Sequence, residues 1–241
     1  MRGRAALAAY LIALIAVGLL PAVAGVSQQA VANALAFSPE HLAQGDLWRL
    51  PASGLVVAGP TWTQLGELIA AVALLVALAG CTTFWRAAVA GHVGSTLLAY
   101  ALVGTLAATK PRAVDGLLAA PDYGISCVFA GSLGALAAVV ARRAPSRGAG
   151  ALGAAACSMP LLSLCGGGFT TAAGALDLAS VEHLLAYACG GLAGVPLIRP
   201  DVRPARSARS RARWRSAATR GATRRAAPGP PVGVAGPAGR C

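Results

Sequence analysis

The stretch PDYGISCVFAG, residues 121–131, places a glycine-framed serine at the start of an apolar segment that continues to a pair of arginines. Ser126 therefore stands at the mouth of a segment long enough to cross a membrane. A serine in this setting has two interpretations. It is a nucleophile activated by a nearby base, or it is a small residue that lets two helices pack closely.

The composition places the chain in a membrane. Hydrophobic residues make up 56% of the 241 residues and charged residues only 12%, unlike an ordinary soluble domain. The net charge of +12 is uneven, because residues 199–241 hold eleven arginines against one acid, Asp201, a net +10. The six cysteines show no metal-binding spacing, and five lie in or beside apolar runs, where a thiol behaves as a small hydrophobe. We expect no metal and no cofactor.

Hydrophobic segments of about 20 residues predict the membrane spans. The six candidates are 5–25, 63–80, 87–108, 123–141, 149–165 and 181–198. The fifth is the weakest, since Pro160 and a run of three glycines would bend or end it, and a five-span count stays open. The first also reads as a cleavable secretory signal. We predict an all-α polytopic membrane protein, with a six-helix bundle over residues 1–198.

The arginines predict the orientation, since short basic loops tend to stay in the cytoplasm. With six spans, the N-terminal arginines, Arg86, the cluster at 142–147 and the tail fall on one side. We predict a multi-pass protein of the cytoplasmic membrane with both termini in the cytoplasm. Segment 26–62 is then external, and its tryptophans and prolines suit a loop lying partly in the membrane interface.

Residues 199–241 form a second predicted unit, a disordered Arg-rich cytoplasmic tail with almost nothing to bury. Basic residues near a membrane surface each attract anionic lipid by about 1 kcal/mol. We therefore expect anionic lipid headgroups as partners of the tail, and no specific nucleic acid.

Ionisable residues inside the spans are costly in lipid and mark candidate functional positions. They are Glu67, His92, Glu182 and His183. Glu67 lies near a span end and suits the headgroup region. His92 stands among small residues in GHVGSTLL, which favours a tight helix contact with a hydrogen-bonded histidine over a catalytic group.

His183 begins a helical face of small residues. Ala186, Gly190 and Gly194 follow it at i+3, i+7 and i+11, so a neighbouring helix can approach closely. His183 and Ser126 lie at similar depths in their spans, and imidazole is a suitable base for a serine hydroxyl. The helix start at Gly124 adds backbone N–H groups of the kind that hold an oxyanion.

These motifs resemble the rhomboid superfamily, six-helix intramembrane serine proteases that pair a GxS serine with a histidine two helices later. Three stretches carry the resemblance: GDLWRLPASGL, GISCVFAG and HLLAYACG. GHVGSTLL and PDYGIS add a likeness to divergent actinobacterial rhomboid-like proteins. The resemblance covers roughly residues 5–198 and implies that Ser126 is the nucleophile and His183 the base.

The chain departs from the family pattern at three places. Cys127 and Ala186 replace glycines of the two motifs, and both are small. The second span, TWTQLGELIAAVALL, lacks the family's histidine and asparagine that support the oxyanion. Gln64 is the candidate substitute, and losing one such donor typically costs about 10²–10³ in turnover.

Three functions remain open from the sequence. The first is proteolysis of transmembrane substrates by the Ser126–His183 dyad. The second is a non-catalytic rhomboid-like protein that binds transmembrane helices of other membrane proteins through the same thin faces. A small transporter is less supported, since the spans hold few charges and no clear inverted repeat.

Overall fold

The structure is a computed structural model that describes residues 2–57, 61–114, 117–118, 121–165 and 178–195. Within these ranges the secondary structure is helical, and the sole β-type pairing is an isolated bridge between Phe37 and Asp122. The chain divides into two units, Met1–Pro196 and Leu197–Cys241. The second unit, and with it the predicted disordered tail, lies outside the described residues.

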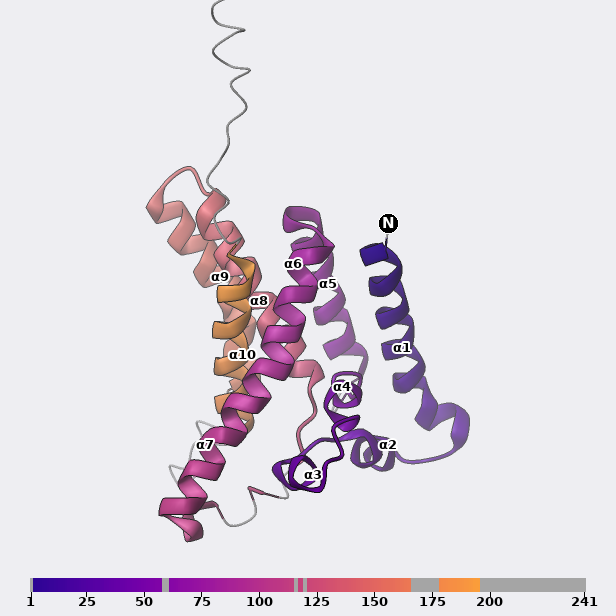
Figure 1. The fold of residues 1–241 in the computed structure, drawn as a ribbon. Helices are drawn as coiled ribbons and strands as arrows, with labels where there is room; N and C mark the ends of the chain where they lie inside the picture. Colours follow the sequence, from indigo (N-terminus) through magenta and orange to yellow (C-terminus); the bar gives the residue numbers. More distant parts are fainter. Residues whose placement is uncertain (1, 58–60, 115–116, 119–120, 166–177, 196–241) are drawn as a thin grey trace, which may run out of the picture. The chain divides into compact units, whose positions relative to one another are not determined.

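Seven of the helices form the long elements seen in Figure 1. They are α1 (Arg2–Ala24), α5 (Thr61–Ala79), α6 (Cys81–Val89), α7 (Ser95–Thr109), α8 (Ile125–Arg143), α9 (Arg147–Cys165) and α10 (Leu178–Gly194). A π-helical turn, Ala90–Gly94, joins α6 to α7 in one continuous helical segment. Three short helices, α2 (Gln28–Leu35), α3 (Pro39–Gln44) and α4 (Arg49–Ser53), lie between α1 and α5, and a 3₁₀ turn, Pro111–Val114, follows α7.

Five helical segments of the described chain are long and apolar enough to cross a membrane, which confirms the helical membrane class. They are Gly3–Ala24, Trp62–Ala79, Cys81–Thr109, Ile125–Arg143 and Arg147–Cys165. The predicted sixth span, 181–198, overlaps α10 as far as Gly194, and residues 196–198 lie outside the described residues. The 17 described residues of α10 are fewer than the usual transmembrane length of about 20. Six spans therefore remain a proposal. The weak fifth candidate is helical through Pro160 as far as Cys165.

The third span begins earlier than the sequence predicts. Its helical segment starts at Cys81, so Arg86 lies within a helix and not in a loop. Gly80 is the one residue between α5 and α6, and its φ of +85° is a backbone conformation that glycine adopts without steric cost. A single glycine thus reverses the chain, and no longer loop is needed there.

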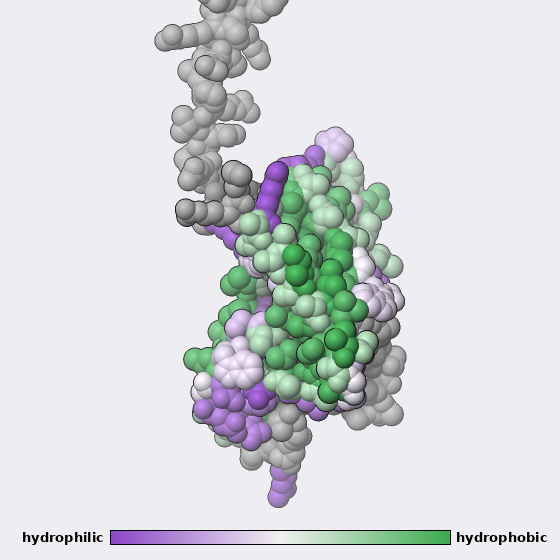
Figure 2. Space-filling view, turned by 90° about the vertical axis from the view of Figure 1, so that its right-hand side faces the viewer, coloured by the Kyte–Doolittle hydropathy of each residue, from purple (hydrophilic) through white to green (hydrophobic). Residues whose placement is uncertain are grey.

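Helix α1 carries much of the apolar surface of the described chain. Ile12 and Val23 are 67% and 82% exposed, whereas Leu14 is fully buried against the other helices. Figure 2 shows a continuous hydrophobic band on this face, with hydrophilic residues above and below it. Such a band suits contact with lipid chains, flanked by polar residues at the two interfaces.

Helix α8 lies at the centre of the first unit. Thirteen of its 19 residues are buried, and α5, α6, α9 and α10 all pack against it. It runs parallel to α10, because Gly131 contacts Gly190 and, further along both helices, Ala135 contacts Gly194. A side chain at position 194 would strain this contact, because a methyl group on Gly194 would lie only 2.8 Å from the Cα atom of Ala135. Small residues hold these backbones together.

The segment between α1 and α5 folds onto the start of α8. Ser27 and Ser38 cap α2 and α3 by accepting hydrogen bonds from backbone N–H groups. Arg49 donates to the carbonyl of Ala34 at 2.6 Å and so satisfies the last turn of α2. Phe37 exchanges two backbone hydrogen bonds with Asp122, of 2.7 and 3.3 Å, which fixes the chain just before α8.

Candidate active site

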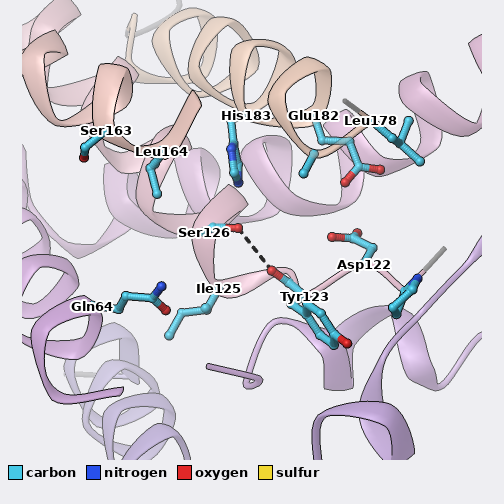
Figure 3. Close-up of a pocket in the computed structure, with 12 residues that line it drawn as sticks. Gln64, Asp122, Tyr123, Ile125, Ser126, Ser163, Leu164, Leu178, Glu182 and His183 are labelled. Carbon is cyan, nitrogen blue, oxygen red and sulfur yellow. Dashed lines mark hydrogen bonds between the residues drawn. The ribbon is translucent and has the colours of Figure 1, made fainter. Parts of the chain in front are cut away.

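Ser126, His183 and Gln64 line a single cavity of about 340 Å³. Ser126 is the second residue of α8 and is half-buried, His183 lies in the second turn of α10 and is buried, and Gln64 comes from the first turn of α5. Figure 3 shows the His183 ring pointing from α10 toward Ser126, with the Gln64 amide extending toward the same first turn of α8. Three residues that the sequence predicts as a site therefore line the same cavity.

The parallel packing of α8 and α10 brings Ser126 and His183 to the same level. The closest contacts pair Gly131 with Gly190 and Ala135 with Gly194, and in each pair the two residues are 59 positions apart in the chain. Ser126 and His183 are 57 positions apart, which is within one helical turn of that register. Because parallel helices keep their register, these contacts bring the serine and the histidine to similar depths.

The Ser126 hydroxyl donates a hydrogen bond to the backbone carbonyl of Tyr123, at 3.1 Å. Figure 3 draws this bond across the turn that begins α8. A bond of this kind is a local alternative that serine side chains often adopt at helix starts. For Ser126 to act as a nucleophile its hydroxyl must turn from Tyr123 to a base.

Gly124 packs against His92 and its backbone N–H is hydrogen-bonded within the protein. Its N–H already donates to the carbonyl of Ser53, at 3.0 Å. Its Cα lies against the His92 ring, so closely that a methyl group there would overlap the ring. These contacts suit the supporting role predicted for Gly124, and the next residues of α8 offer further backbone N–H groups at the helix start.

His92 is buried and hydrogen-bonded, but its partners belong to the segment between α1 and α5. Its Nε2 lies 2.7 Å from the carbonyl of Leu50 and 3.3 Å from the hydroxyl of Ser53. His92 sits in the π-turn that joins α6 to α7. It links that span to α4 and, through Gly124, to the start of α8.

Two acidic side chains form one wall of the cavity, and the sequence did not indicate that they meet. Asp122 and Glu182 are both buried and line the cavity with Ser126 and His183. Their carboxylates face one another in Figure 3. Thr96 donates a hydrogen bond to Asp122 at 3.1 Å. Glu182 was noticeable in the sequence as an acidic residue in an apolar segment. Its pairing with Asp122 was not, because Asp122 comes from a loop 60 positions earlier.

The remaining predicted residues lie away from the cavity. Ala186, Gly190 and Gly194 are buried on the face of α10 that packs against α8. Glu67 is exposed beside a separate, mainly apolar hollow of about 430 Å³ that Cys157 also lines.

No protein-family model, no curated protein and no solved structure matches this chain. The assignment of a function therefore depends on the residues of the cavity.

Proposed function

We propose that the protein is a rhomboid-like intramembrane serine protease in which Ser126 is the nucleophile and His183 the base. The observation that carries the proposal is the joint position of Ser126, His183 and Gln64 around one cavity of about 340 Å³. The cavity adjoins the starts of α8 and α10, and a transmembrane substrate would be cut near the matching end of its own helix.

In the first half-reaction the Ser126 oxygen attacks the carbonyl carbon of the scissile peptide while His183 accepts the hydroxyl proton. The imidazolium then gives that proton to the leaving amine, and an acyl-enzyme remains. Water from the cavity hydrolyses the acyl-enzyme with His183 again as base. Positioned proton transfer of this kind contributes roughly 10²–10⁴ in rate.

Two groups are available to hold the oxyanion of the tetrahedral intermediate. The first turn of α8 leaves the N–H groups of Ile125 and Ser126 without acceptors inside the helix. The half-buried Gln64 residue lines the same cavity. Removing a single oxyanion donor typically lowers turnover by about 10²–10³, so Gln64→Ala tests its part in the reaction.

A serine-directed fluorophosphonate probe tests the nucleophile without knowledge of the substrate. We expect purified wild-type protein to be labelled and Ser126→Ala and His183→Ala to remain unlabelled. Ser163→Ala is the matched control, because Ser163 lines the same cavity but donates to the carbonyl of Pro160 at 2.8 Å. It should label like the wild type. Absence of wild-type labelling beside a reactive rhomboid standard, or labelling that persists in Ser126→Ala, would remove the protease proposal.

The hydrogen bond from Ser126 to Tyr123 favours a second candidate, a non-catalytic protein that binds transmembrane helices of other proteins. In that case the hydroxyl serves the helix start, and function depends on the thin faces of α8 and α10. Co-purification of bound membrane proteins would then survive Ser126→Ala and disappear with a bulky residue at Gly190.

A further inference from the structure

Beside the proposed serine site lies a cluster of three buried side chains with metal-binding atoms. A carboxylate oxygen of Asp122, the thiol sulfur of Cys127 and a carboxylate oxygen of Glu182 all lie within 4.8 Å of one another. Asp122 precedes α8, Cys127 is on its first turn, and Glu182 comes from α10. Two carboxylates and a thiol held this close together in a buried place form a set of ligand atoms that one divalent cation can bridge.

Tyr100 provides a second and independent observation. It is 5% exposed, it is fixed by ring stacking on Phe37 with centroids 5.6 Å apart, and its hydroxyl has no hydrogen-bond partner among the described residues. Tyr100 lies beside Asp122 on two counts: it follows Thr96, which donates to Asp122, by one turn of α7, and it stacks on Phe37, whose backbone pairs with Asp122. A buried phenol without a partner is costly, so a hydroxyl of this kind beside Asp122 supports a bound group at the cluster.

We infer that Asp122, Cys127 and Glu182 bind one divalent metal ion of the Zn²⁺ type. One thiolate and two carboxylates suit this borderline ion better than Mg²⁺ or Ca²⁺, which prefer oxygen ligands alone. Tetrahedral Zn²⁺ with bonds of about 2.0–2.3 Å separates its ligand atoms by roughly 3.3–3.8 Å, so the side chains need only close slightly.

The cavity gives the ion a path of entry and a fourth ligand. Asp122 and Glu182 both line it, so an ion and a water molecule reach the cluster from there. On binding, the Cys127 thiol loses its proton to solvent and the sulfur forms the bond to the metal. The Tyr100 hydroxyl then donates a hydrogen bond to a ligating carboxylate, an interaction whose loss commonly weakens metal affinity about 10–100-fold.

The test is metal binding by the full chain, purified through an affinity tag without histidine and stripped with a chelator. We expect one Zn²⁺ per chain by elemental analysis, and with Co²⁺ a near-ultraviolet thiolate-to-metal charge-transfer band. Cys127→Ser should lose the band, and Glu182→Gln should lose stoichiometric binding. Tyr100→Phe should retain the band with an affinity lowered about 10–100-fold.

Matched variants separate this cluster from adventitious sites. Cys157→Ser and Glu67→Gln change the same residue types at positions beside a different hollow and should bind like the wild type. A variant that keeps Cys127 as its sole cysteine should retain the Co²⁺ band, which decides the case even if Cys127→Ser does not fold. Substoichiometric wild-type binding, or a band lost from the sole-cysteine variant, would overturn the inference. Ser126→Ala should bind Zn²⁺ normally, so failure of the protease proposal leaves this one standing.

Discussion

Two adjacent glycines of α10 offer a sharp test of the packing that places the candidate site. Gly190 is buried, and a methyl group added to it would overlap the backbone of Gly131 on α8. Gly191 is half-buried, and a methyl group there would lie 3.5 Å from the nearest atom, the carbonyl oxygen of Gly134. Gly190→Ala should therefore separate α8 from α10, whereas Gly191→Ala should not.

The pair allows the magnitude to be isolated. Both substitutions gain the same helix propensity, about 0.5–1 kcal/mol relative to glycine, so this gain cancels in the comparison. Overpacking typically costs about 1–3 kcal/mol, and the upper end applies at Gly190 because the obstructing atoms are backbone and cannot change rotamer. A difference of about 3 kcal/mol corresponds to roughly 6–12 °C in Tm for a unit of this size.

The assay is thermal unfolding of the detergent-solubilised protein, followed by tryptophan fluorescence. Gly191→Ala should unfold at or slightly above the wild-type Tm, and Gly190→Ala well below it. Fluorophosphonate labelling at a temperature where both remain folded should fall in Gly190→Ala alone, because Ser126 and His183 are aligned by this contact. Equal Tm values for the two variants would show that α8 and α10 do not approach as closely as the structure has them.

Three further predictions concern the surroundings of the site. Gly124→Ala should lower stability by about 1–3 kcal/mol in thermal unfolding because its methyl group would overlap the His92 ring, while Gly148→Ala, with open space around it, should be neutral or slightly stabilising. Arg49→Lys should lower the free energy of unfolding by about 0.5–1.5 kcal/mol, since an ammonium group cannot reproduce the guanidinium hydrogen bonds to the end of α2. Tryptic cleavage before α5 should then be faster, and unchanged cleavage would contradict this. Zn²⁺ at 100 times its Kd should stabilise the wild type by about 2.7 kcal/mol and leave Cys127→Ser unaffected, as a shift in Tm will show.

The long helices could be predicted from sequence because length and hydropathy alone specify them. The small-residue face of α10 likewise indicated a close helix contact, and the equal depths of Ser126 and His183 indicated one site. The earlier start of the third span could not be predicted with the same ease. It depends on the φ angle of Gly80, and a glycine between two apolar runs is equally compatible with a longer loop.

The acidic wall was missed for a different reason. Asp122 is placed by backbone hydrogen bonds to Phe37, a residue 85 positions away, and Glu182 arrives on another helix. No local pattern connects these segments, and Cys127 read as a small hydrophobe because its neighbours in sequence are apolar. Tertiary pairing decided which polar groups meet, and periodicity carries no information about that.

The packing of α8 against α10 accounts both for the glycine contacts and for the position of the polar groups of the site. Helices α8 and α10 touch backbone to backbone from Gly131 onward, which leaves no room for polar side chains between them. Nearer their starts the residues are larger, and the space between the helices opens into the cavity. Polar groups on these two faces are therefore confined to one end of the pair. Ser126 and Cys127 are consecutive on α8, and about 100° of helical rotation directs one to the Gln64 side and the other to the acidic pair. Under the two proposals, a single turn of α8 supplies both the nucleophile of the cavity and one ligand of the metal ion at its wall.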